Sequence, residues 1–168
     1  GKVSVSEIEA IEKRKTLQSG EYKSQEQLLS SSLVEEKLHK GTPKEQYKKA
    51  FDLLQESKYD LAEIELKAFI NFNKNNPLAE NARYWLGEIF YVRKAYKKAA
   101  QAFFEGFQES PKGSKAADSL LKLGMSLSRL GKKQDACAAF AKLDMDFNRA
   151  PDRIRKALSR ESAINDCS

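Results

Sequence analysis

Residues 82–107 read ARYWLGEIFYVRKAYKKAAQAFFEGF, and this stretch decides the fold because its landmarks recur at a fixed distance along the chain. Ala99 has counterparts 37 residues away on either side, at Ala62 and Ala136. The same offset joins three further sets: Ala50, Gly87 and Gly124; Leu66, Phe103 and Phe140; Tyr59, Tyr96 and Lys133. Small residues that recur in step with large apolar ones indicate a stacked supersecondary unit, which is usually a binding surface.

Each 37-residue unit reads as two antiparallel helices, because apolar residues return at helical spacing on either side of a short turn. A last amphipathic helix has no partner of its own and reads as the cap that a repeat stack needs at its exposed end. The predicted helices are 44–55, 59–73, 78–92, 96–109, 116–130, 133–147 and 151–164.

We therefore expect an all-α domain over 43–168, made of three hairpins and the cap helix. The hairpins occupy about 43–79, 80–116 and 117–150, and the cap helix occupies 151–164. A capping box opens the domain, with Thr42 as N-cap, Pro43 in the first turn and Glu45 three residues on.

Residues 1–42 are polar and show no sustained apolar stripe, so we expect a flexible leader with possible short helices. The leader holds seven basic and seven acidic residues, so the net charge of +6 belongs entirely to the repeat region. There the lysines alternate with Glu and Asp along helices, which favours solvated faces over a nucleic-acid site. A scaffold for an anionic polymer stays open as a minor alternative. No apolar run reaches the ~18 residues of a membrane helix, so membrane insertion is not expected.

The sequence offers no catalytic constellation. His39 has no nucleophile at a recognised spacing, and Glu63 and Glu65 fall on different faces of their helix. The two cysteines, Cys137 and Cys167, lack a metal-binding spacing. We predict a protein that is not an enzyme and holds no cofactor and no metal.

The middle unit carries the tetratricopeptide pattern in Trp85-Leu86-Gly87, Phe90-Tyr91, Tyr96, Ala99, Phe103 and Pro111. The third unit keeps Leu123-Gly124, Gly131, Ala136 and Phe140. In the first unit, Lys49-Ala50 replaces the Leu-Gly pair. The resemblance implies three tetratricopeptide hairpins stacked as a short right-handed superhelix.

In arrays that the chain resembles, the first helix of each hairpin lines a concave groove that holds an extended or helical peptide. For the apolar members of this set, above all Phe51 and Leu121, packing between helices is an equally good interpretation. Trp85 and Leu86 are assigned to the core. The groove candidates by register are Tyr47, Phe51, Gln55, Asn81, Tyr84, Glu88, Tyr91, Asp118, Leu121, Met125 and Arg129.

A closer resemblance rests on Tyr47-x-x-Ala50-Phe51-x-Leu53-Leu54, Ala82-x-Tyr84-Trp85-Leu86-Gly87-Glu88 and Leu120-Leu121-Lys122-Leu123-Gly124. These segments are similar to the C-terminal repeat domain of the periplasmic Tol-Pal system family, the cell-division coordinators of Gram-negative bacteria. The resemblance implies a periplasmic, non-catalytic scaffold that contacts TolA and a bifunctional penicillin-binding peptidoglycan synthase. Such a scaffold helps couple outer-membrane constriction to septal wall synthesis.

The family forms trimers through an N-terminal coiled coil, but residues 1–42 show no sustained heptads, so the sequence predicts no oligomeric state. Because residue 1 is a glycine, we expect a processed or trimmed chain. The periplasmic address implied by the resemblance implies that a signal peptide has been removed.

Asp135-Ala136-Cys137, with Cys167 near the end, is similar to alphaproteobacterial members of the family. The periplasmic address implied by the resemblance favours a disulfide, which would stabilise the fold by roughly 3–4 kcal/mol for a loop of this length. Two unpaired thiols are the alternative.

Two further functions stay open. One is a tetratricopeptide adaptor in another envelope-assembly or chaperone complex. The other is a cytosolic chaperone adaptor that clamps a C-terminal carboxylate, which is disfavoured because Tyr47 and Phe51 stand where that clamp needs Lys and Asn.

Overall fold

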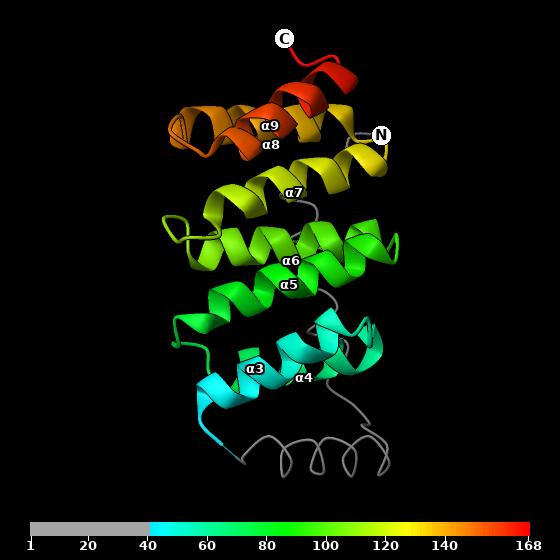
Figure 1. The fold of residues 1–168 in the computed structure, drawn as a ribbon. Coiled ribbons are helices and arrows are strands. Elements are labelled where there is room, and N and C mark those ends of the chain that lie inside the picture. Colours follow the sequence, from blue (N-terminus) through cyan, green and yellow to red (C-terminus); the bar gives the residue numbers. More distant parts are fainter. Residues whose placement is uncertain (1–40) are drawn as a thin grey trace, which may run out of the picture. The chain divides into compact units, whose positions relative to one another are not determined.

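The computed structural model describes residues 41–168, which form helices and no strand. Apart from Gly41 and Thr42, the predicted leader with His39 lies outside the described residues. Every helix begins and ends within one residue of its predicted bounds, so the all-α class and the helix order are confirmed. The helices are α3 (Pro43–Gln55), α4 (Tyr59–Phe72), α5 (Leu78–Val92), α6 (Tyr96–Glu109), α7 (Ala116–Arg129), α8 (Lys133–Asp146) and α9 (Asp152–Ile164) (Figure 1).

The helices pair as three hairpins, α3–α4, α5–α6 and α7–α8, which stack in chain order (Figure 1). The turn of each hairpin has a residue with positive φ: Ser57 (58°), Lys94 (61°) and Gly131 (75°). A residue in the left-handed conformation allows the backbone N–H groups at the helix end to bond to the last carbonyls of the helix. Only glycine adopts this conformation without a steric penalty. These positions are again 37 residues apart, so the period of the sequence is also a period of the backbone.

The capping box at the start of α3 is formed as predicted. The Thr42 hydroxyl accepts a hydrogen bond from the Glu45 backbone N–H at 3.2 Å, and the Thr42 N–H donates to Glu45 Oε2 at 2.8 Å. Two backbone donors at the helix end are thereby satisfied, which fixes where α3 begins.

Small residues mark the close helix crossings, as the sequence predicts. A Cβ atom added to Gly87 would lie 2.6 Å from the Phe103 ring, and one on Gly124 would lie 2.3 Å from the Phe140 ring. Both phenylalanines are almost fully buried. The helices of the second and third hairpins can pack this closely only because the rings cover positions that have no side chain.

The core runs along the stack as two apolar clusters. The first cluster is shared by α3 to α6 and the second by α6 to α9, and Leu123 packs against both. Each fully buried Leu, Ile or Phe side chain contributes about 1.5–3 kcal/mol to the stability of the fold. Neighbouring hairpins are therefore held together by shared apolar contacts.

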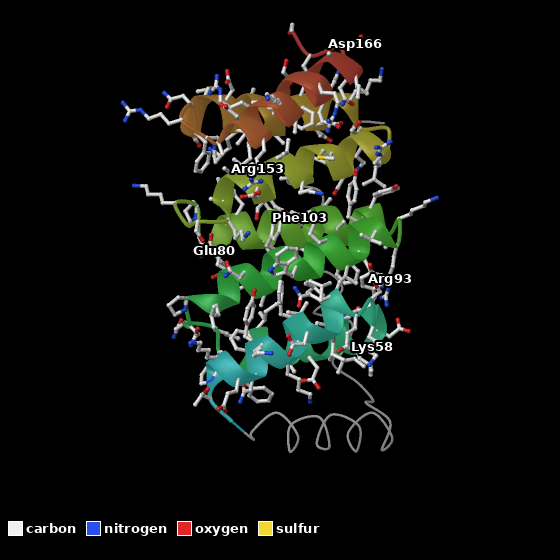
Figure 2. All side chains as sticks on the ribbon, viewed as in Figure 1. Lys58, Glu80, Arg93, Phe103, Arg153 and Asp166 are labelled. Carbon is white, nitrogen blue, oxygen red and sulfur yellow. A yellow bond between two sulfur atoms is a disulfide. The ribbon has the colours of Figure 1, made fainter. Side chains whose placement is uncertain are left out.

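Helix α9 packs on α7 and α8 and is attached to them by three contacts. Ile154 is 1% exposed in the second cluster. Arg153 donates to both carboxylate oxygens of Asp118, at 2.7 and 3.3 Å, and lies between α9 and α7 (Figure 2). Beyond the end of α9, the Cys167 sulfur lies 1.99 Å from that of Cys137 on α8. The predicted cap helix is thus bonded to the last hairpin near both of its ends.

Candidate functional site

The first helices of the hairpins share one side of the stack. Helix α3 contacts α5, α5 contacts α7 and α7 contacts α9, each more closely than the second helices contact one another. In a stack that bends, the helices on the inner side approach one another. We refer to the side formed by α3, α5, α7 and α9 as the inner face; it is the side on which the sequence places the binding site.

An aromatic cluster joins α3 to α5 on the inner face. The Phe51 and Trp85 rings meet edge to face with centroids 5.4 Å apart, and Trp85 meets Tyr84 at 5.1 Å. Tyr47 stacks on Phe51 at 6.1 Å. Such pairs contribute about 0.5–1.5 kcal/mol each beyond the area that they bury, so these rings form a fixed apolar wall.

Trp85 belongs to this wall and is only half-buried, which corrects its assignment to the core. Leu86, assigned with it, is buried as expected. The repeat pattern places Trp85 between helices, and its ring meets Phe51 of the preceding hairpin while the residue stays partly exposed. The sequence gives no sign of this contact, because 34 residues separate the two rings.

Tyr47 and Asn81 lie together at the first-hairpin end of the wall, and both are half-buried. Burial raises the pKa of the Tyr47 hydroxyl, while hydrogen bonds with Trp85 and Asn81 partly oppose that shift. The hydroxyl is therefore neutral at physiological pH and serves as a hydrogen-bonding group.

Lys115, which the sequence analysis did not select, lies against the same rings. Its ammonium nitrogen is 4.8 Å from the centroid of Tyr84 and 5.4 Å from that of Trp85. Its backbone N–H donates to Glu80 Oε1 at 2.6 Å. Because Lys115 precedes α7, helical register could not assign it to a face.

A group of polar residues on α5 and α7 also lies on the inner face. Glu88 pairs with Lys122 at 3.0 Å, and the Lys122 ammonium lies 4.9 Å from the centroid of the Tyr91 ring. Arg129 is exposed and donates through Nε to the Tyr91 hydroxyl at 3.4 Å. Glu88 and Tyr91 are half-buried, so the structure brings three predicted residues and Lys122 together at a partly accessible surface.

Three of the groove candidates are buried; this departs from the expectation for Tyr84 and Asp118, and for Leu121 it agrees with the alternative of packing between helices. Tyr84 is 8% exposed because Phe103 packs against it, and Asp118 and Leu121 are each 6% exposed beneath α9. Met125 is half-buried and packs against the second cluster. Burial raises the pKa of the Tyr84 hydroxyl, and the Glu88 and Asp118 carboxylates raise it further. These residues pack beneath the inner face, so most of each side chain is out of reach of a partner.

Neither a scan against protein-family models nor a search of the curated proteins found a match to the chain. Within residues 41–168, no group of three or more His, Cys, Asp and Glu could hold a metal ion. In the same range no helix is long and apolar enough to cross a membrane.

The half-buried part of the inner face offers ring surface, hydroxyl and amide groups and paired charges. Aromatic anchors with a few polar groups around them are typical of sites that bind a polypeptide segment.

Proposed function

We propose that the protein is a non-catalytic scaffold whose inner face binds a segment of a partner protein. The observation that carries this proposal is the fixed wall of Phe51, Trp85 and Tyr84, which joins two hairpins and leaves Phe51 and Trp85 half-buried. Rings that are already ordered lose little conformational entropy when a segment binds, so more of the contact energy remains as affinity.

The partners we propose follow from the resemblance of the chain to the Tol-Pal system family. They are TolA and a bifunctional penicillin-binding peptidoglycan synthase, and the setting is the periplasm during cell division. The pairing of Cys137 with Cys167 supports an oxidising compartment, since such bridges persist outside the cytosol.

Truncating two accessible rings tests the proposal. In Phe51→Ala with Tyr91→Ala, binding to the periplasmic part of TolA or of the synthase should weaken at least about 100-fold, a typical cost of losing two aromatic anchors. Tyr84 is left intact because removing its buried ring would open a cavity. Affinity is measured by calorimetry, and circular dichroism verifies that the variant is folded.

Leu61→Ala with Met145→Ala is the matched control, because both side chains are exposed on second helices, at 52% and 78%. This variant should bind like the unmodified protein. Unchanged affinity in the folded Phe51/Tyr91 variant would place the site elsewhere.

A further inference from the structure

Lys115 is held in place by three contacts from helix α5. Glu80 of α5 accepts the Lys115 backbone N–H at 2.6 Å, and the ammonium group lies over the Tyr84 and Trp85 rings of the same helix. The side chain is half-buried. Its charge is therefore fixed beside the aromatic wall before any partner arrives.

The ammonium group of Lys115 has no carboxylate partner among residues 41–168. Nearby cations differ in this respect: Lys122 pairs with Glu88 and Arg153 pairs with Asp118. An ammonium group has three N–H donors, and contact with ring faces leaves donors available. Lys115 thus offers an unneutralised positive charge at the edge of an apolar surface.

We infer that the inner face selects partner segments that carry a side-chain carboxylate next to a large apolar residue. The carboxylate pairs with the Lys115 ammonium, and the apolar side chain packs against Phe51 and Trp85. A hydrogen bond between charged groups is stronger than a hydrogen bond between neutral groups. Charge complementarity also favours an acidic segment over a basic segment at this site. The inference rests on the proposed function and adds the chemistry of the partner.

Trp85 is the single tryptophan of the chain, so its fluorescence reports on this site alone. Lys115→Gln should shift the emission of the free protein, because the charge over the indole is lost. Lys112→Gln is the matched control; Lys112 carries the same charge three positions away, is exposed, and lies over no aromatic ring of residues 41–168.

The probe is an array of 12-residue peptides of random sequence, acetylated and amidated at their ends so that only side chains carry charge. Binders of the unmodified protein should be enriched in Asp or Glu beside Phe, Leu or Ile. Titration of the best binders, followed by Trp85 fluorescence, gives the affinities. Lys115→Gln should weaken these about tenfold or more, the range for loss of a hydrogen bond between charged groups. Lys112→Gln should leave them unchanged, and replacing the acidic residue of the peptide by its amide should reproduce the loss.

Equal affinity in Lys115→Gln, binders without acidic residues, or an array without binders would each overturn the inference. If the Phe51/Tyr91 variant loses TolA or the synthase while Lys115→Gln retains it, the proposed function stands and only this inference fails. If both variants bind normally, both fail.

Discussion

At the residue scale, Gly87 illustrates how a single side chain controls the spacing of a hairpin. A Cβ atom at this position would meet the fully buried Phe103 ring, and the third hairpin repeats the arrangement with Gly124 and Phe140. The first hairpin has Ala50 and Leu66 at the corresponding positions, and both are buried. In the first hairpin Leu66, which is smaller than phenylalanine, leaves room for the methyl group of Ala50 on the facing helix.

We expect Gly87→Ala to destabilise the fold by about 1–3 kcal/mol, because the added Cβ would lie 2.6 Å from the fully buried Phe103 ring. Adding Phe103→Leu copies the first hairpin and should recover part of that loss. Urea unfolding of both single variants and the double variant forms a cycle whose coupling should be favourable. Purely additive effects would show that the ring and the glycine do not constrain each other.

Glu63 is another residue whose environment has a measurable consequence. Burial raises the pKa of its carboxyl, but Lys67 at 2.7 Å and Arg93 at 2.8 Å outweigh that effect and bring the pKa below its ordinary value of 4.5. A group with a lowered pKa stabilises the fold at neutral pH, and that contribution is lost as the pH falls through its folded pKa.

Glu63→Gln should therefore lower the free energy of unfolding at pH 7, by about 0.5–1 kcal/mol for ion pairs at a partly exposed site. The difference from the unmodified protein should shrink below pH 4.5. Melting temperatures between pH 7 and pH 3 measure this. Glu109→Gln is the control, since Glu109 is exposed and forms no ion pair within 41–168. A difference that stays constant with pH would contradict the assignment.

At the element scale, local signals are enough to predict where the helices begin and end. The Thr42–Glu45 capping box and the 37-residue period are read directly from the sequence, and the helix bounds follow from them. The burial of Asp118 under α9 depends on Arg153, which lies 35 residues away, and no local pattern encodes that contact. The same holds for Lys115, whose neighbours come from α5. The fold was therefore more predictable than the accessibility of the site.

The attachment of α9 gives a prediction for the cysteine pair. Replacing Cys137 and Cys167 together by Ser should lower the free energy of unfolding by roughly 3–4 kcal/mol, because the unfolded chain loses the constraint of a closed loop. Alkylation in denaturant, followed by mass spectrometry, should label no thiol before reduction and two after it. Equal labelling with and without reductant would show that the bridge does not form.

At the scale of the whole repeat domain, stability should depend on position in the stack. Within residues 41–168 the main contacts of each hairpin are with its neighbours, so the free energy of unfolding is close to a sum of hairpin and interface contributions. Helices α5 to α7 have packed neighbours on both sides, whereas α3 and α4 contact one neighbouring hairpin within residues 41–168. At the other end, α9 is held by Ile154, by the Asp118–Arg153 pair and by the cysteine pair.

Hydrogen exchange should therefore show the strongest protection in α5 to α7 and weaker protection in α3, because end elements open without unfolding the centre. Helix α9 should be protected in the oxidised protein. Reduction of the cysteine pair should lower the protection of α9 amides and leave that of α5 unchanged, since α5 lies two hairpin interfaces away from the released end. Mass spectrometry of peptides from each helix, with and without reductant, measures both effects. A loss of equal size in α5 and α9 would show that the stack unfolds as one cooperative unit, in which neighbouring interfaces are too strong to open separately.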